Sequence, residues 1–187
     1  SASNSAKNDR FSGYAGETRA KIQTLAEISL QETPRFTSGF KELDRVLGGG
    51  IVPGSAILIG GHPGAGKSTL LLQVMCGLAK NMTALYVTGE ESLQQVAMRA
   101  NRLNLPTDKL NMLSETSVEQ ICNLADQLKP QIIVVDSIQV MHLSDIQSSP
   151  GSVAQVRECA SFLTRYAKTR QVAIIMVGHV TKDGTIA

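Results

Sequence analysis

The chain has 187 residues, a hydrophobic content of 42%, a net charge of +2 and no tryptophan. This is enough apolar material for one aliphatic core, and the charge is too small to require a nucleic-acid partner by itself. The three cysteines are widely spaced, which argues against a disulfide framework or a CxxC metal site. No apolar run reaches the roughly 20 residues of a membrane span, and the first residues do not resemble a signal peptide. We therefore expect a soluble, cytoplasmic protein without a membrane partner.

The first part of the chain predicts a linker followed by a short helix. Residues 1–21 are rich in Ser, Ala, Asn, Gly and charge and lack a sustained apolar period, so we expect a flexible linker there and an ordered core over 22–187. A helix is predicted to open at Thr37 or Ser38 and to stop at the glycines of 48–50. Its apolar face would consist of Phe40, Leu43 and Leu47.

Beyond residue 55, short apolar runs alternate with helical patterns. The runs predict strands at 56–59, 84–88, near 111–114, 131–136 and 172–177, and the intervening patterns predict helices at about 67–80, 93–103, 116–128 and 151–170. The run 56–59 predicts a strand that is buried on both faces. The third helix opens with Thr116-Ser-Val-Glu119, the pattern of a capping box. Strands that alternate with helices predict an α/β fold in which helices cover both faces of a parallel sheet.

The helix predicted over 151–170 has two distinct faces. Apolar residues at steps of three and four predict a buried face formed by Val153, Val156, Ala160, Leu163 and Ala167. The opposite, polar face carries Arg157, Ser161, Arg165 and Lys168. A solvated basic face is the ordinary explanation, and a surface for DNA or for a neighbouring subunit is the alternative.

Residues 61–68 read Gly-His-Pro-Gly-Ala-Gly-Lys-Ser and match the pattern GxxxxGK[ST] between a predicted strand and a predicted helix. The glycines let consecutive backbone N–H groups turn toward phosphate oxygens, and the helix presents its positive end to the same anion. The pattern predicts a P-loop (Walker A) site for ATP. It would be formed by Gly61, His62, Pro63, Gly64, Ala65, Gly66, Lys67, Ser68 and Thr69.

Three residues in and beyond this loop have predicted roles. Lys67 would reach the β- and γ-phosphates as a point charge, and the Ser68 hydroxyl would bind Mg²⁺. Asp136 ends the predicted strand 131–136, where P-loop enzymes hold the magnesium ion through its water shell. A solvated aspartate at a strand end is the alternative explanation.

Glu90 and Glu91 follow the strand 84–88 at the edge of the sheet where ligands bind in open α/β folds. Hydrolysis of ATP needs a group that orients and deprotonates water, but both glutamates are also suited to stabilising a helix N-terminus. The spacing does not choose between these roles. His179 follows the last strand after one glycine, where it would sense the γ-phosphate and transmit its loss to Thr181–Gly184, or would be an exposed loop histidine.

Several runs outside the phosphate loop form a distinctive set. They are Tyr86-Val-Thr-Gly-Glu90-Glu91-Ser-Leu, Val135-Asp136-Ser-Ile-Gln139, the stretch 147–158, and the stretches 47–55 and 177–184. Together these runs are similar to the bacterial DNA repair proteins of the RadA (or Sms) family. The resemblance covers about residues 10–187. It implies a RecA-like ATPase core that assembles into hexameric rings with ATP between neighbouring subunits. Such proteins act with the RecA recombinase on single-stranded or branched DNA in homologous recombination.

The resemblance also implies roles for residues that spacing leaves open. By position, Glu90 matches the catalytic glutamate of RecA-like ATPases and His179 matches their γ-phosphate sensor, so that Lys67, Glu90 and His179 form the catalytic set. The segment 146–152 corresponds to one DNA-binding loop, and 181–187 begins the other. Together with the basic face of the helix 151–170, these segments make Arg157, Arg165, Lys168 and Lys182 the candidate DNA contacts.

The chain lacks other parts of the family pattern. The amino-terminal four-cysteine zinc module, a Lys-Asn-Arg-Phe-Gly motif and a Lon-protease-like carboxy-terminal domain are not found in it. Zinc is therefore expected only in the missing module, and we interpret the chain as a fragment that is poorly active alone. Two other functions stay open: an ATP-gated assembly switch with little turnover, and a small-molecule kinase of the P-loop class, although no Arg-rich lid is evident.

Overall fold

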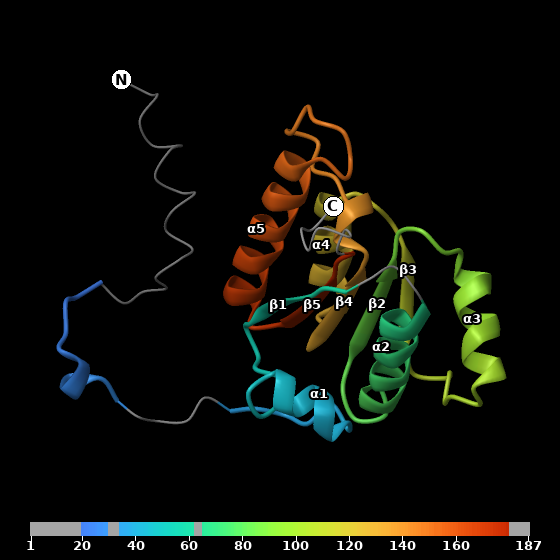
Figure 1. The fold of residues 1–187 in the computed structure, drawn as a ribbon, viewed down its shortest axis with the longest axis horizontal. Coiled ribbons are helices and arrows are strands. Elements are labelled where there is room, and N and C mark those ends of the chain that lie inside the picture. The colour runs from blue at the N-terminus through green and yellow to red at the C-terminus, as the bar shows by residue number, and fades with distance from the viewer. Residues whose placement is uncertain (1–19, 30–33, 62–64, 180–187) are drawn as a thin grey trace.

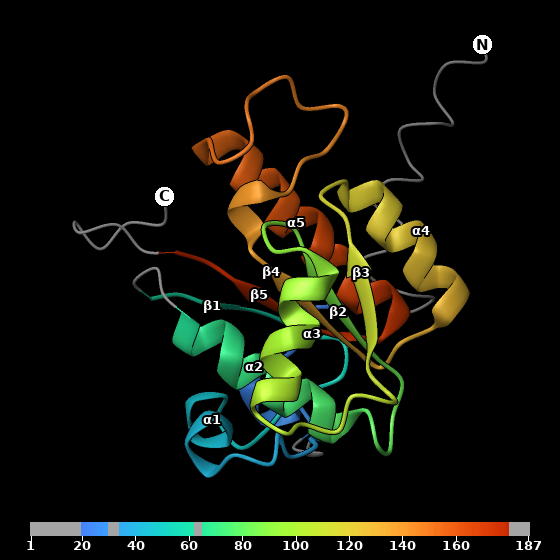
Figure 2. The same cartoon turned by 90° about the vertical axis from the view of Figure 1, so that its right-hand side faces the viewer.

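The computed structural model describes residues 20–29, 34–61 and 65–179. In this part of the chain, five parallel strands form one sheet in the order β1-β5-β4-β2-β3 (Figures 1 and 2). The strands are β1 (Ala56–Ile59), β2 (Ala84–Thr88), β3 (Asn111–Ser114), β4 (Ile132–Asp136) and β5 (Ala173–Val177). All five predicted strands are confirmed, and two of them start one residue later than predicted.

Helices cover both faces of the sheet (Figure 2), as predicted. Side chains of β2, β4 and β5 alternate between two apolar clusters, because successive residues of a strand point to opposite faces. One cluster includes buried residues of α4 (Val118–Leu128) and α5 (Val153–Arg170). The other includes buried residues of α2 (Ala65–Leu78) and α3 (Leu93–Arg102). The α/β fold is therefore confirmed.

The prediction that the first strand is buried on both faces is wrong. In the described part of the chain β1 pairs with β5 alone, and the Leu58 side chain is 38% exposed. The central strands β2, β4 and β5 are buried throughout. A short apolar run does not reveal which strand lies at an edge, because strand order depends on pairing and not on composition.

The first helix, α1 (Lys41–Val46), begins later than the predicted Thr37 or Ser38. Asp44 explains the difference: its carboxylate accepts hydrogen bonds from the Thr37 hydroxyl and from the Ser38 backbone N–H, at 2.8 Å for the latter. Hydrogen bonds from Ser38 and then from Thr37 lower the pKa of Asp44. The polar residues thus build a turn before the helix, and Phe40, predicted on the buried face, is exposed.

The predicted capping box of α4 is also wrong. Ser117, and not Thr116, is the N-cap residue, and its hydroxyl accepts from the Gln120 N–H at 3.3 Å. Glu119 instead accepts two hydrogen bonds from Ser144, from the backbone N–H at 2.7 Å and from the hydroxyl at 2.8 Å. The box pattern is present in the sequence, but a loop distant in sequence competes for its glutamate.

The predicted buried face of α5 is correct only in part. Leu163 and Ala167 are buried, but Val153 is 66% exposed, and Gln155, Cys159 and Tyr166 complete the buried face instead. An apolar pattern misses these positions because the polar groups of Gln155 and Tyr166 find hydrogen-bond partners inside the protein.

Residues 20–29 form an arm that includes a short 3-10 helix, η2 (Leu25–Glu27), and contribute no buried side chain. The packed body begins with the backbone bridge between Phe36 and Ile51. Most of the predicted linker lies outside the described residues, so the boundary near residue 22 stays a prediction. None of the helices that the structure describes has the length and apolar character that crossing a membrane requires.

Candidate nucleotide-binding site

The carboxyl ends of four strands align at one edge of the sheet. Val177 of β5 is in register with both Ile59 of β1 and Asp136 of β4, and Asp136 is in register with Thr88 of β2. The segments that follow these strands contain every residue of the predicted catalytic set. The register therefore brings together Lys67, Glu90, Asp136 and His179, which are far apart in the sequence.

The phosphate loop is described at its two ends. His62, Pro63 and Gly64 lie outside the described residues. Gly61 follows β1, and α2 begins at Ala65, so that Gly66, Lys67, Ser68 and Thr69 lie at the helix N-terminus. The first backbone N–H groups of a helix have no partner within it, which makes this end suitable for an anion.

Lys67 links the phosphate loop to the last strand. Its Nζ donates a hydrogen bond to the Gly178 carbonyl oxygen at 2.8 Å. A Cβ atom at Gly61 would lie 3.1 Å from this Nζ, so a side chain there would crowd the lysine. Burial lowers the pKa of Lys67, and the charge of Asp136 partly opposes that effect. Lys67 is therefore a partly buried cation at the sheet edge.

Asp136 is buried and is held by a neighbouring strand. The hydroxyl of Tyr86, a fully buried residue of β2, donates to Asp136 Oδ2 at 2.7 Å. Burial, together with the negative charge of Asp136, raises the pKa of Tyr86, which keeps the hydroxyl protonated. A carboxylate at Asp136 and a hydroxyl at Ser68 are oxygen ligands of the kind that Mg²⁺ prefers, so the residues present fit this ion.

Glu90 is positioned by a close contact of the preceding glycine. A Cβ atom at Gly89 would lie 2.5 Å from Val140 Cγ2 of η3 (Ile138–Val140), so only glycine fits at this point. The chain then turns so that Glu90 Oε1 accepts from the Ser137 hydroxyl at 3.0 Å and lies 3.9 Å from His179 Nε2. The Glu90 side chain remains 50% exposed.

Glu91 has a different environment from Glu90. Its Oε2 forms an ion pair with Arg99 Nη1 of α3 at 2.7 Å, and the Arg99 side chain is only 11% exposed. Burial works to lower the pKa of Arg99, but the hydrogen bond and charge of Glu91 outweigh it and raise that pKa. Sequence spacing left the two glutamates equivalent, whereas in the structure Glu91 is engaged by an arginine and Glu90 faces His179.

His179 is joined to η3 through a residue that the sequence analysis did not single out. Gln139 Nε2 donates to the His179 carbonyl oxygen at 3.3 Å. Within the described part of the chain, Gln139 Oε1 and His179 Nδ1 are buried without a hydrogen-bond partner. Ser137 and Gln139 both follow Asp136 in the run Val135–Gln139, and that proximity was the only available signal for them. The predicted relay through Thr181–Gly184 lies outside the described residues.

The loop predicted to bind DNA is held by a buried amide. Gln155 of α5 accepts from the Leu143 N–H at 2.9 Å and donates to the carbonyl oxygens of Ser148 at 2.8 Å and Ile146 at 3.4 Å. The side chain is almost completely buried. The loop between η3 and α5 projects at the top of Figure 2. Gln155 therefore fixes part of its shape, a role that the sequence did not reveal.

The predicted basic face of α5 is present, and its cations are spread along the length of the helix. Arg157, Arg165 and Lys168 are exposed, and Arg165 Nη1 donates to the Ser161 hydroxyl at 2.9 Å. Arg157 lies near the loop, while Lys168 lies about 16 Å further along the helix axis. Lys182 is outside the described residues. The three described cations therefore form a stripe that begins at the loop.

Other kinds of site have little support in the described residues. No group of three or more His, Cys, Asp or Glu side chains among them could hold a metal ion. Cys76, Cys122 and Cys159 are free and buried, as predicted for small core residues.

A family model described as an AAA domain matches residues 23–185. The chain belongs to the AAA domain family. Several similar curated proteins are named DNA repair protein RadA. The protein of Haemophilus influenzae is 94% identical over 97% of this chain, and that of Escherichia coli is 73% identical over 97%. The Bacillus subtilis protein is 49% identical over 93%. The resemblance to the RadA family is thereby confirmed.

The AAA domain covers a limited part of these relatives. The chain spans 40% of the length of the Haemophilus and Escherichia proteins. Among solved structures, a KaiC-like protein of Pyrococcus horikoshii matches with a TM-score of 0.66 and 18% identity, over 82% of this chain and 74% of that one. This likeness concerns the fold, and together with the family match it confirms the RecA-like α/β architecture.

Proposed function

We propose that the chain is the ATP-binding motor core of a DNA repair ATPase. The observation that carries the proposal is the alignment of Lys67, Glu90 and Asp136 at one sheet edge beside a phosphate-loop helix. The AAA family match and the names of the relatives support the same function. The core would cover residues 22–187, with further domains outside it.

The binding step would use the phosphate loop. Backbone N–H groups at the start of α2 and the ammonium group of Lys67 would bind the phosphates of ATP, exchanging the Gly178 carbonyl for a phosphate oxygen. Ser68 would bind Mg²⁺ directly, and Asp136 would do so through water. When bound, the ion supplies neutralisation of the negative charge on the phosphates.

Glu90 would orient and deprotonate the attacking water. It is half-exposed at the same edge, and its Ser137 hydrogen bond holds the carboxylate in place. Glu91 would not compete, because its carboxylate is bound to Arg99. His179 would sense the γ-phosphate, and the Gln139 contact with its backbone would carry the change to η3 and the loop that follows.

The DNA partner would bind at the loop and along α5. The segment 146–152 is held by Gln155, and Arg157 is the nearest cation of the basic stripe, so we expect contributions to affinity to fall from Arg157 to Arg165 and Lys168. Lys182 would add a contact. In its full length the protein would form hexameric rings and act with the RecA recombinase on single-stranded or branched DNA in recombination, in the bacterial cytoplasm.

The test measures ATP hydrolysis by the full-length protein with and without single-stranded DNA. Lys67→Ala is expected to abolish nucleotide binding. Glu90→Gln is expected to keep binding and to lose turnover by at least about 100-fold, while Glu91→Gln, the matched control, keeps most of its turnover. DNA should stimulate hydrolysis less as salt rises.

Three outcomes would contradict this function. Absence of DNA stimulation at every salt concentration would exclude the motor. Tight binding of ATP with negligible turnover would indicate an assembly switch, and transfer of the γ-phosphate to a small molecule would indicate a kinase.

Isolated residues 1–187 should bind ATP but hydrolyse it slowly.

A further inference from the structure

Tyr86 is a core residue with a polar end at the candidate site. It lies in the middle of β2 and is fully buried against the cluster beneath α2 and α3. Tyr86 is in register with Val134, so Asp136 lies two residues further along the neighbouring strand and on the same face of the sheet. This diagonal spacing is within reach of a long aromatic side chain, and the hydroxyl meets Asp136 Oδ2 at 2.7 Å.

Packing alone does not require the hydroxyl group. Phenylalanine would fill nearly the same volume at a fully buried position, and burying a hydroxyl is costly unless it is hydrogen-bonded. Asp136 is the partner that the structure shows for the hydroxyl. The phenol group is therefore explained by the carboxylate that it holds and not by the core around it.

Arg99 of α3 is a largely buried cation near these two residues. Its Nη1 is bound to Glu91, while Nε and Nη2 are buried without a hydrogen-bond partner among the described residues. The charge of Asp136 contributes to the raised pKa of Arg99. Arg99 itself is bound to Glu91, and the Tyr86 hydroxyl is the contact that the structure shows for the Asp136 side chain.

We propose that Tyr86 is a positioning residue for Mg²⁺ that acts through Asp136. This inference rests on the proposed function. By holding Oδ2, the hydroxyl fixes the rotation of the carboxylate and leaves Oδ1 as the oxygen available to the water shell of the ion. Groups that hold a metal ligand in this way typically affect metal affinity by about 10- to 100-fold.

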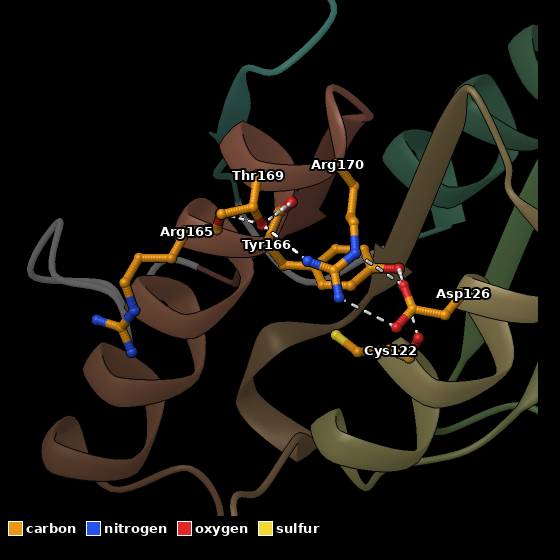
Figure 3. Close-up of polar contacts among 6 residues, drawn as sticks. All are labelled: Cys122, Asp126, Arg165, Tyr166, Thr169 and Arg170. Atoms are coloured by element: carbon orange, nitrogen blue, oxygen red, sulfur yellow. Dashed lines mark hydrogen bonds and ion pairs between the residues drawn. The ribbon is translucent and has the colours of Figure 1, made fainter. Parts of the chain in front are cut away.

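The chain offers a matched control in a second buried tyrosine. The Tyr166 hydroxyl donates to Asp126 Oδ1 at 2.7 Å, the same contact as in the first pair, but between α5 and α4 (Figure 3). Removal of either hydroxyl deletes one hydrogen bond between a tyrosine and an aspartate. Only removal of the Tyr86 hydroxyl alters the candidate metal ligand.

The experiment measures binding of a fluorescent ATP analogue to the full-length protein as Mg²⁺ is titrated. Tyr86→Phe should bind the analogue normally without Mg²⁺, and should need about tenfold more Mg²⁺ for half of the Mg²⁺-dependent increase in affinity. Tyr166→Phe should match the wild type in both. In the Asp136→Asn background, Tyr86→Phe should cause no further shift, because its effect passes through that carboxylate.

The results separate this inference from the proposed function. If the wild type shows no Mg²⁺-dependent binding, the proposed function fails. If it does and Tyr86→Phe has an unchanged Mg²⁺ midpoint, the positioning role is refuted. Should Tyr86→Phe not fold, Tyr86→Met, which also lacks the hydroxyl, replaces it with the same expected shift. An unchanged midpoint in that variant would then refute the inference.

Discussion

Two tyrosine–aspartate pairs show how one contact serves different purposes in this molecule. At the carboxyl edge, Tyr86 holds one oxygen of Asp136, and the cation nearby, Arg99, is bound to Glu91 instead. Near the ends of α4 and α5, Tyr166 holds Asp126, and here Arg170 binds both carboxylate oxygens, from Nε at 3.0 Å and from Nη2 at 3.2 Å.

The two aspartates differ in how many hydrogen bonds their carboxylate oxygens accept. Asp126 accepts hydrogen bonds at both oxygens, and the Arg170 guanidinium also lies 5.1 Å from the centroid of the Tyr166 ring (Figure 3). We call Asp126, Tyr166 and Arg170 the closed cluster, because these side chains bind one another. It borders a pocket of about 470 Å³, yet its own polar groups satisfy one another. Asp136 keeps acceptor capacity. Incomplete satisfaction, and not the residue pair itself, marks the candidate functional position.

The largest expected effect comes from replacing each of the two aspartates, Asp136 and Asp126, by asparagine. Asp136→Asn should lower Mg²⁺-dependent ATP hydrolysis by about 100-fold or more, because the carboxylate charge supports the metal. Asp126→Asn should keep turnover and lower the melting temperature by about 2–4 °C, since the Arg170 pair is half-exposed. Steady-state kinetics and thermal unfolding of both variants check this, and loss of turnover in Asp126→Asn would break the comparison.

A second large effect is expected at Gln155, whose side-chain amide forms hydrogen bonds with the loop that precedes α5. Gln155→Leu should lower stability by about 1–3 kcal/mol, because buried backbone groups of the loop lose their partners. It should also weaken DNA binding by about tenfold if the loop contacts DNA. Gln94→Leu, at an exposed position of α3, serves as the control. Wild-type DNA affinity in a folded Gln155→Leu protein would show that the loop shape is irrelevant to DNA.

The closed cluster should also show a defined pH dependence. Hydrogen bonds from Arg170 and then Tyr166 lower the pKa of Asp126 below its ordinary value of 3.8. A lowered folded-state pKa contributes stability that is fully present above 3.8 and is lost as pH falls through the folded value. The stability gap between wild type and Asp126→Asn, measured by urea unfolding, should therefore be constant from about pH 5 to 8 and shrink below about pH 4. A gap that grew in acid would contradict this account.

The smallest effect is expected on the exposed face of α5. Arg165→Ala should change stability by no more than about 0.5 kcal/mol, because its contact with Ser161 is exposed. If Arg165 meets a phosphate, the slope of log affinity for DNA against log salt should fall by about one. Binding isotherms at several salt concentrations measure that slope, and an unchanged slope would remove Arg165 from the DNA surface.

The sequence predicted the architecture better than the details of the site. The strands 84–88 and 111–114 were predicted with their observed bounds, because apolar runs bordered by turn residues carry a strong local signal. The phosphate-loop helix and Asp136 at a strand end followed from the same signals. The position of β1 at the edge of the described strands depended on strand order, and no local pattern encodes that order.

The details that escaped prediction are contacts of polar side chains with residues outside their own helix or strand. Gln155 is satisfied by a loop, Tyr86 by a neighbouring strand, and Glu119 by Ser144 in place of its own helix cap. Spacing alone did not separate Glu90 from Glu91, although the family resemblance favoured Glu90. The ion pair that distinguishes Glu91 in the structure depends on Arg99 and on the packing of α3. Periodicity counts apolar residues and therefore cannot find such positions.

The central claim is that the carboxyl edge of the sheet binds ATP together with Mg²⁺. Calorimetric titration of ATP into the folded protein, with and without Mg²⁺, tests it most directly. The account predicts saturable binding at one site per chain, tightened by Mg²⁺ and abolished in Lys67→Ala. Absence of binding heat with a well-folded wild-type protein across several temperatures, or undiminished binding in Lys67→Ala, would contradict it.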